Sequence, residues 1–407
     1  MALLVQKFGG TSVADPERMR SVAENVARCR RRGDEVVLVV SAMGKETDDL
    51  LRMAAEVSPH RPGREMDMLI TAGERKAIAL MAMALHAAGV ESESYTGSQA
   101  GFITDPNHTN AKIVDVRADR IRAALDAGRV PVVAGAQGVS VDNDVTFLGR
   151  GGSDTTAVAL AKALGADACE LYTDVSGVFT TDPRVVPAAR RMNSITFDEM
   201  LEMTAAGCPK PAMRSVEYAH RHRVPLHVRS AFTWEPGTWV VEESDDVEAA
   251  LIRAVVADDS EAKVTVSGVP DRPGVAAGLF RRLADADINV DMIVQNVSEG
   301  GVTDISFTVP HTQLDDALAV CDAHGGEVGA QKVISDPRIA KVSVIGAGMK
   351  SNPGVAATMF EVLAANGINI EMISTSAIRI SCVIADADAD RAVQVLHDAY
   401  ELDRTTF

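Results

Sequence analysis

A lysine beside a glycine pair, near the N-terminus, is the first candidate for phosphate chemistry. The segment Lys7-Phe8-Gly9-Gly10-Thr11-Ser12 follows a predicted strand and precedes a predicted helix. Glycines let backbone N–H groups approach an anion, and the first turn of a helix adds a favourable partial charge. Lys7 supplies a point charge for a transferring phosphoryl group. The segment alone is a weak signal, because it lacks the spacing of a Walker A loop and suits a purely structural turn equally well.

A second glycine-rich segment, Gly149–Thr156, precedes the alanine-rich helix predicted over Ala157–Leu164. Ser153 or Asp154 could simply cap that helix at its N-terminus. Such a cap leaves Arg150 unexplained, because its planar guanidinium suits a carboxylate or a phosphate. We therefore expect this segment to bind an anionic substrate group.

Two further clusters carry carboxylates. The segment Tyr172–Arg184 follows a predicted strand, and open α/β sheets place their ligands at such strand ends, although an Asx-rich turn explains the pattern as well. Glu74, within Thr71–Arg75, could hold an ammonium group. Taken alone, a solvated glutamate near the start of a helix is the simpler interpretation of Glu74.

Composition narrows the class of protein. A chain of 407 residues is long enough for two or three domains, and its net charge of −17 argues against a nucleic acid or an anionic membrane as partner. The five cysteines are scattered, with no pair at metal-ligand spacing, which fits a reducing cytoplasm. The N-terminus lacks the pattern of a signal peptide, and no apolar run is long enough to span a bilayer. We expect a cytoplasmic protein with no protein-bound metal site.

The elements that position these residues form an α/β pattern up to about residue 245. Apolar runs typical of strands buried on both faces alternate with helical stretches, which predicts a mostly parallel sheet between helices. The predicted strands are Leu3–Val5, Glu35–Ser41, Val130–Ala134 and Ala168–Thr173. The character changes around Pro236-Gly237 and the acidic stretch that follows.

The last third of the chain contains an internal repeat. Pro273-Gly274-Val275-Ala276-Ala277 recurs as Pro353-Gly354-Val355-Ala356-Ala357, and the match continues at the same offset to Ile288-Asn289 and Ile368-Asn369. Each copy has the pattern of strand, tight turn, amphipathic helix and strand, with a third strand after it. We expect two small domains, over 260–330 and 338–407, with a C-terminal strand available to complete the first.

Together these motifs resemble the aspartate kinases of the amino acid kinase family. The matches include Lys7–Ser12, Ser41-Ala42-Met43-Gly44, Thr71–Arg75, Gly149–Thr155 and Thr173–Arg184, and they cover nearly the whole chain in the family order. The repeats resemble the paired βαββαβ ACT domains of these enzymes. The resemblance, closest to the monofunctional actinobacterial type, implies conversion of L-aspartate and ATP, with Mg²⁺, to 4-phospho-L-aspartate and ADP. That reaction is the first step toward lysine, threonine and methionine.

The resemblance also implies roles for individual residues. Lys7 would stabilise the transferring phosphoryl group, and Asp154 would orient Lys7. Residues expected at the aspartate site are Ser41, Thr47, Glu74, Arg150, Gly151 and Ser153. Those expected at the nucleotide site, besides Lys7, are Gly9, Gly10, Thr173, Asp174, Phe179, Asp182, Arg184 and Lys210. Those expected to bind amino-acid effectors, threonine or lysine, are Asp271, Gly274, Ala276, Gln295, Asn369, Ile370 and Ser376.

This sequence departs from the family pattern at the nucleotide site. Pro209 occupies the place of a lysine that contacts ATP in the family, and Lys210 follows one position late. Two prolines here stiffen the loop and remove backbone donors. Either Lys210 takes over the contact or nucleotide affinity is weakened. Ser176 and Phe147 replace a usual aspartate and threonine.

A further departure concerns regulation. Ala377 stands where lysine-sensitive relatives have a glutamate, which leaves feedback by lysine open, because a buried cation without a counter-charge is costly. Two alternatives to an aspartate kinase follow from these departures: a related amino-acid kinase with another acceptor, and an effector-binding protein with a degenerate kinase domain. Sheet edges of the repeats predict a homodimer through the ACT domains, because exposed edges tend to pair.

Overall fold

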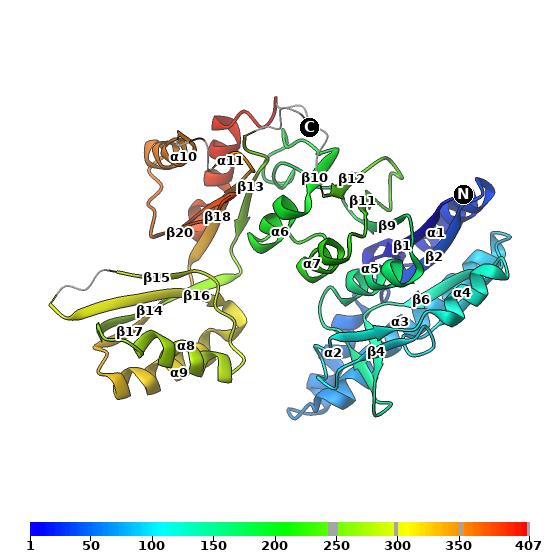
Figure 1. The fold of residues 1–407 in the computed structure, drawn as a ribbon, viewed down its shortest axis with the longest axis horizontal. Helices are drawn as coiled ribbons and strands as arrows, with labels where there is room; N and C mark the ends of the chain where they lie inside the picture. Colours follow the sequence, from blue (N-terminus) through cyan, green and yellow to red (C-terminus); the bar gives the residue numbers. More distant parts are fainter. Residues whose placement is uncertain (243–250, 297–299, 350–351, 353, 405–407) are drawn as a thin grey trace.

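The structure, a computed structural model, describes residues 1–242, 251–296, 300–349, 352 and 354–404. The expected boundary near residue 245 lies outside these residues, as do Val297 and Pro353. Figure 1 shows a large N-terminal domain and two small domains, of which the second, in orange and red, lies beside the N-terminal domain. The first, in yellow, projects away from it. Among the described residues, no helix has both the length and the apolar character needed to cross a membrane.

The N-terminal domain is built on an eight-stranded sheet, and the expected mostly parallel arrangement is confirmed. The strand order is β10-β12-β11-β9-β1-β2-β6-β3, and only the pair β11–β12 is antiparallel. Strand β1 lies near the centre, between β9 and β2, so its carboxyl end meets theirs at one edge. The strands are β1 (Leu3–Phe8), β2 (Glu35–Val40), β3 (Ser92–Tyr95), β6 (Val130–Ala134), β9 (Ala168–Thr173), β10 (Ser194–Thr196), β11 (Leu226–Ser230) and β12 (Thr238–Val241).

Helices cover both faces of this sheet, and alternation along β1 decides which residue faces which layer. Val5 packs in the core beneath α5, whereas Phe8 packs in the core beneath α1 and α3. Lys7 shares the α5 side with Val5. The helices of the domain are α1 (Pro16–Arg31), α2 (Glu46–Val57), α3 (Gly63–Ala87), α4 (Asp119–Asp126), α5 (Gly152–Leu164), α6 (Phe197–Ala205) and α7 (Met213–His222).

A second, four-stranded sheet in the order β5-β4-β7-β8 precedes α5 in the chain. Its last strand ends at Phe147, immediately before the glycine-rich segment. The strands are β4 (Phe102–Thr104), β5 (Ile113–Val116), β7 (Gln137–Ser140) and β8 (Val145–Phe147).

The two repeats form separate four-stranded sheets, in the orders β15-β16-β14-β17 and β13-β18-β20-β19. The first has β14 (Glu261–Pro270), α8 (Val275–Asp285), β15 (Ile293–Gln295), β16 (Val302–Pro310), α9 (Leu314–Val328) and β17 (Lys332–Asp336). The second has β13 (Ala254–Asp258), β18 (Ile339–Ile345), α10 (Gly354–Ala365), β19 (Met372–Thr375), β20 (Arg379–Ala385) and α11 (Ala389–Ala399).

The expectation that a C-terminal strand completes the first repeat is wrong. In the described part of the chain, the segment after β20 forms α11, because Ala392, Val393 and Leu396 recur at helical spacing and bury one face. The first repeat is completed by β17 instead. The second repeat takes its extra strand, β13, from the segment that precedes the first repeat.

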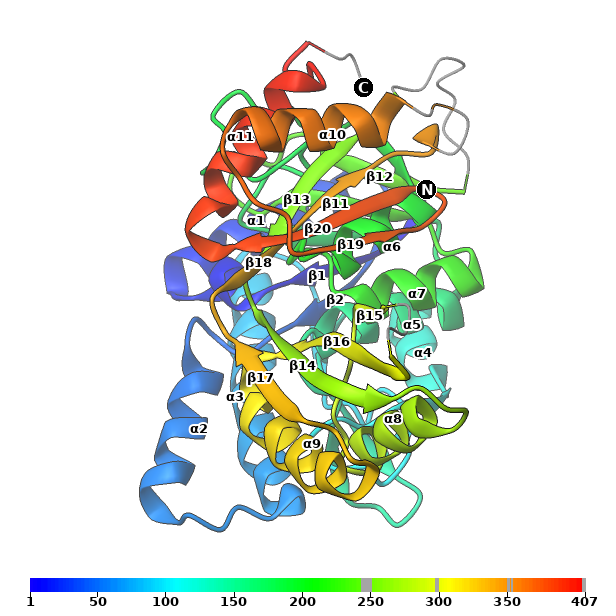
Figure 2. The same ribbon diagram turned by 90° about the vertical axis from the view of Figure 1, so that its left-hand side faces the viewer.

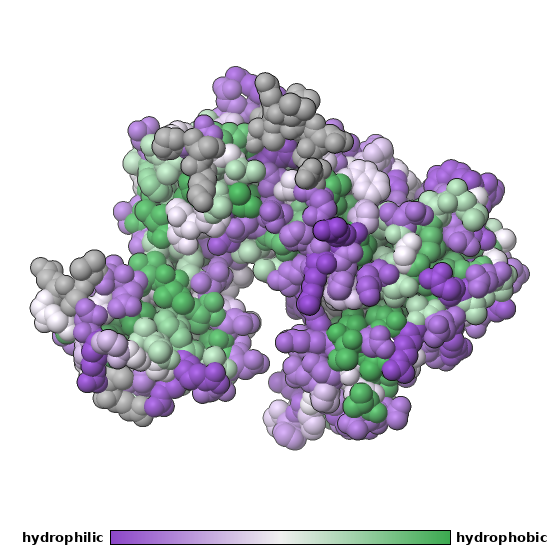
Figure 3. All heavy atoms as spheres, viewed as in Figure 1, coloured by the Kyte–Doolittle hydropathy of each residue, from purple (hydrophilic) through white to green (hydrophobic). Residues whose placement is uncertain are grey.

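The second repeat shares a core with the N-terminal domain. One cluster of buried apolar side chains runs without interruption from α6 and α7 into β13, β18 and α11, whereas the first repeat has its own core. Figures 1 and 2 both place α6 against the sheet of the second repeat. Figure 3 shows open space between the first repeat and the lower part of the N-terminal domain.

Candidate active site and effector pocket

A buried ion pair lies at the carboxyl edge of the main sheet. Lys7, on β1, places its Nζ 2.6 Å from Oδ1 of Asp154, in the first turn of α5. Both side chains are almost completely buried. Asp154 is therefore not a helix cap, and the N-cap position is Gly151.

Asp154 remains ionised despite its burial. Desolvation by itself raises the pKa of Asp154, but the charge of Lys7, its hydrogen bond, the charge of Lys210 and the Ala212 N–H together lower it below the ordinary value. The Ala212 N–H donates to Oδ2 at 3.1 Å. Because Lys210 acts on this carboxylate, its charge lies near the site although it stands one position late in the sequence.

Glycines permit the close approaches around this pair. A Cβ at Gly10 would lie 2.9 Å from the carbonyl oxygens of Ala42 and Gly44, and one at Gly151, whose φ is +75°, would lie 2.6 Å from Cβ of Ala212. The backbone after β1 and before α5 thus packs closely against Ala42, Gly44 and Ala212, and α5 directs its N-terminus toward the Lys7–Asp154 pair. This geometry suits phosphate oxygens.

Two serines join the glycine segments. Ser41 follows β2 and donates its hydroxyl to Oγ of Ser153, in α5, at 2.9 Å. Gly135, after β6, leaves the necessary space, because a Cβ there would lie 2.5 Å from Oγ of Ser153. Residues from the ends of β1, β2 and β6 therefore meet at the start of α5.

Glu74 differs from the expectation of a solvated side chain near a helix start. It lies in the interior of α3 and is 3% exposed, because α3 begins at Gly63. Its Oε1 accepts from the Ala42 N–H at 3.3 Å, whereas Oε2 is buried without a hydrogen-bond partner in the described part of the chain. Desolvation raises the pKa of Glu74 to about 7. A buried, unpartnered carboxylate oxygen is suited to a bound cation.

Thr47 and Arg150, also expected at the aspartate site, lie near this cluster in the sequence. Thr47 is in the first turn of α2 and is half-buried, and Arg150 is exposed between β8 and α5. The structure gives no hydrogen bond from either side chain to Ser41, Ser153 or Glu74 within the residues it describes.

The expected nucleotide residues follow β9. Thr173 ends this strand and donates to Oδ1 of Asp174 at 2.9 Å. Asp182 and Arg184 pair with each other at 2.6 Å on the surface, which lowers the pKa of Asp182. Phe179 pairs with Arg191 in an isolated bridge that closes the loop.

Sequence reasoning missed two parts of this edge. Ser230 ends β11 beside Thr173, and the Ala231 N–H donates to the Thr173 carbonyl at 2.9 Å. The apolar alternation of Leu226–Ser230 could have indicated this strand. Ala212 contributes only a backbone N–H, for which no sequence signal exists.

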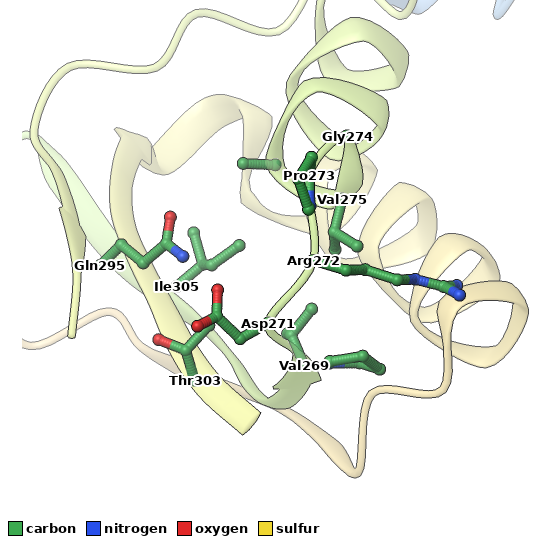
Figure 4. Close-up of a pocket in the computed structure, with 11 residues that line it drawn as sticks. Val269, Asp271, Arg272, Pro273, Gly274, Val275, Gln295, Thr303 and Ile305 are labelled. Carbon is green, nitrogen blue, oxygen red and sulfur yellow. The ribbon is translucent and has the colours of Figure 1, made fainter. Parts of the chain in front are cut away.

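The first repeat contains a pocket of about 320 Å³. Figure 4 shows Asp271, Gln295 and Thr303 directed into it, whereas Arg272 turns away. Four of the expected effector residues line it: Asp271, Gly274, Ala276 and Gln295. Thr303 also lines it, and no sequence motif indicates this residue.

The other three expected effector residues lie outside this pocket. Asn369, Ile370 and Ser376 belong to the second repeat, whose sheet is separate. Ser376 faces the N-terminal domain instead, and its hydroxyl donates to Oε1 of Glu202 in α6 at 2.7 Å.

Comparison with known proteins agrees with this architecture. Residues 2–230 match the amino acid kinase family, and residues 264–324 and 342–400 match the ACT domain. The chain is 56% identical over 407 residues to the aspartokinase of Mycolicibacterium smegmatis, covering 99% of this chain and 97% of the relative. It is 52% identical over 407 residues to the aspartokinase of Corynebacterium glutamicum, with the same coverage.

Solved structures show the same likeness. Aspartokinase III of Escherichia coli in complex with aspartate and ADP has a TM-score of 0.84 and 26% identity, covering 98% of this chain and 99% of that chain. The aspartate kinase of Synechocystis is 45% identical with a TM-score of 0.56, covering 98% of this chain and 70% of that one.

Proposed function

The chain belongs to the amino acid kinase family as an aspartokinase, and we propose that the edge around Lys7 and Asp154 transfers the γ-phosphoryl group of ATP to the side-chain carboxylate of L-aspartate. The observation that carries this assignment of residues is the buried ion pair, with 2.6 Å between Lys7 Nζ and Asp154 Oδ1. It holds a cation at the edge where the glycine backbone of β1 and the N-terminus of α5 converge.

The reaction requires little proton chemistry from the protein. A carboxylate is already a nucleophile at neutral pH, so no general base is needed, and catalysis depends on alignment and on stabilising the developing charge. Lys7 supplies that charge, and Asp154 fixes the ammonium in position. Backbone N–H groups after Gly9 and Gly10 add donors that need no reorganisation during the reaction.

Glu74 is the proposed partner of the substrate ammonium. Its Oε2 is buried and unpartnered in the described residues, and an ammonium would supply the missing hydrogen bond and counter-charge. Arg150, which is exposed, would bind a substrate carboxylate once aspartate is present, and Ser41, Thr47 and Ser153 would contact the rest of the molecule.

Magnesium would enter with the nucleotide. The described residues contain no group of three or more His, Cys, Asp or Glu side chains arranged to hold a metal, and Mg²⁺ in kinases is held largely by phosphate oxygens and water with one or two carboxylates. Asp174, exposed at the end of β9, is the carboxylate that would contact it. The ion would neutralise phosphate charge during transfer.

The pocket of the first repeat is the proposed effector site, and L-threonine is the proposed ligand. Asp271 offers a carboxylate for the ammonium, while Gln295 and Thr303 offer polar groups for the carboxylate and hydroxyl. The lysine response would be weak or absent, because Ala377 leaves no counter-charge for a second ammonium.

Assembly and location are proposals of the same kind. Strands β15 and β19 are edges of their sheets and carry the exposed residues Ile293 and Ile373, which suits a homodimer through the ACT domains. The five cysteines are free thiols, which suits the reducing cytoplasm.

The phosphotransfer assignment is tested by trapping the product. With saturating L-aspartate and Mg·ATP, hydroxylamine should yield aspartyl hydroxamate, and glutamate should yield far less. Absence of hydroxamate with aspartate would overturn the proposal, and a better signal with another acidic amino acid would assign a different acceptor.

A further inference from the structure

Glu202 connects the second repeat to the catalytic edge. We propose that Glu202 is a positioning residue, which holds α6 so that Lys210 and the Ala212 N–H stay at the nucleotide site, and that the second repeat controls ATP binding through it. This inference rests on the proposed function and on the role at the nucleotide site that the family resemblance implies for Lys210.

The contact at Glu202 uses both carboxylate oxygens. Oε1 accepts from the Ser376 hydroxyl at 2.7 Å, and Oε2 lies 3.1 Å from Nη1 of Arg379. The Arg379 side chain is 14% exposed and that of Glu202 is 22% exposed. Ser376 lies between β19 and β20, and Arg379 begins β20. One turn of the second repeat therefore contacts both carboxylate oxygens of Glu202 in α6.

The end of α6 is fixed by a second set of contacts. Lys341, on β18, donates to the Ala205 carbonyl at 3.4 Å. Gly207 has a φ of +111°, and a Cβ there would lie 2.6 Å from Cβ of Asp258, on β13. The chain leaving α6 therefore lies directly on the sheet of the second repeat.

The segment after α6 reaches the active site within a few residues. The Cys208 thiol donates to the Lys210 carbonyl at 3.3 Å, and the Ala212 N–H donates to Asp154, which holds Lys7. Pro209 and Pro211 restrict φ on both sides of Lys210. A stiff segment transmits a shift of α6 to the active site, whereas a flexible loop would absorb it. Pro209 and Pro211 would therefore help to couple α6 to the nucleotide site.

The consequence is a physical path between the regulatory domain and the nucleotide. It runs from Ser376 and Arg379 through Glu202 and α6 to Ala212 and Asp154. Any rearrangement of the turn between β19 and β20 changes the contacts of Glu202. The Mg·ATP affinity should then change more than the aspartate affinity, because Glu74 and Ser41 lie on other elements.

The test compares Glu202→Gln and Arg379→Gln with Asp198→Asn, an exposed carboxylate on the same helix. For each variant, kcat and the KM of both substrates are measured, together with the dissociation constant of Mg·ADP by calorimetry.

We expect Glu202→Gln and Arg379→Gln to raise the KM of ATP and the dissociation constant of ADP roughly three- to tenfold, as loss of one charge-assisted hydrogen bond implies. The KM of aspartate should change less than about twofold, and Asp198→Asn should match the unmodified protein. The double variant Glu202→Gln/Arg379→Gln should bind ATP and ADP no more weakly than either single variant, because both substitutions remove the same contact.

Unchanged nucleotide constants in both variants would overturn the inference. So would a parallel loss of kcat, both KM values and thermal stability, which would indicate a purely structural contact. If those variants fail to fold, Ser376→Ala, which removes an exposed hydroxyl, decides with the same measurements. Failure of the proposed function would appear separately, as no hydroxamate from the unmodified protein, and ADP calorimetry would still test Glu202.

Discussion

Lys341 of the second repeat lies 2.5 Å from the carboxylate of Asp291 in the first repeat, and its side chain is only 1% exposed. The carboxylates of Glu261 and Asp258 also lie near the Lys341 ammonium, at 3.1 Å and 3.9 Å. Desolvation lowers the pKa of Lys341, but the carboxylates outweigh it and hold the pKa above the ordinary value. At the equivalent place in the other repeat, Lys263 pairs with Glu371, so the repeats exchange reciprocal ion pairs.

These two pairs should differ in their effect on stability. Lys341→Met leaves carboxylates clustered without their cation and should lower the free energy of unfolding by about 2–3 kcal/mol, below the ~3–5 kcal/mol of fully buried pairs because the carboxylates retain some solvent. Lys263→Met is the matched control and should cost at most ~1 kcal/mol, because both side chains of its pair with Glu371 are about a quarter exposed. Chemical denaturation followed by circular dichroism measures both, and equal losses would contradict the distinction.

Removal of Lys7 should separate catalysis from folding. Lys7→Met should reduce kcat at least ~100-fold, as loss of a group that stabilises transition-state charge does. It should also destabilise the protein, because only the Ala212 N–H and the charge of Lys210 would then stabilise the buried Asp154. The double variant Lys7→Met/Asp154→Asn should recover stability without recovering turnover. Turnover within tenfold of the unmodified protein, or no recovery in the double variant, would refute the assigned roles.

Glu74 predicts a dependence on pH. Burial raises the pKa of its carboxyl from 4.5, the ordinary value that it has in the unfolded chain, to about 7 in the folded protein. Below pH 4.5 both states are protonated. As pH rises from 4.5 to 7, the unfolded state loses its proton first, so the free energy of unfolding should fall, by about 3 kcal/mol, and then level off. Glu74→Gln should abolish this fall, while Glu91→Gln, on the surface, should not.

Ionisation of Glu74 should favour substrate binding, although it lowers the free energy of unfolding. An ammonium prefers the ionised carboxylate, so the KM of aspartate should decrease as pH rises through 7. Binding near pH 6.5 should release a proton from the protein, which calorimetry in buffers of different ionisation enthalpy detects. A KM that is flat from pH 6 to 8 would remove Glu74 from the ammonium site.

The sheet could be predicted because local pattern determines it, whereas the pairing of Lys7 with Asp154 was implied only by the family resemblance. Buried apolar runs specify β1, β2 and β9, and the glycine segments after β1 and before α5 indicate an anion site. Glu74 could not be placed correctly, since its burial depends on the start of α3 at Gly63, which lacks a side-chain cap. The repeat was visible as recurring residues, but recurrence does not say which sheet receives β13.

Tertiary contacts explain the remaining differences. Ser376 matches an effector motif by sequence, yet Glu202 of α6 accepts its hydroxyl. Thr303 lines the pocket because β16 pairs with β14, which is a long-range register that local pattern does not encode. Residues whose role depends on a neighbour distant in the sequence are thus the ones that sequence reasoning misses.

Asp271 should decide the response to threonine. Asp271→Asn keeps the shape of the pocket but removes the charge proposed to bind the effector ammonium, so the threonine concentration for half-inhibition should rise about tenfold or more. The kcat without effector should stay the same, because the pocket has its own core in the first repeat. Asp315→Asn, in the exposed first turn of α9, is the control and should be inhibited normally. Lysine added alone should have little effect on either variant, since Ala377 provides no counter-charge. Undiminished inhibition of Asp271→Asn by threonine would place the effector elsewhere, and the exposed turn around Ser376 would then be the first segment to substitute.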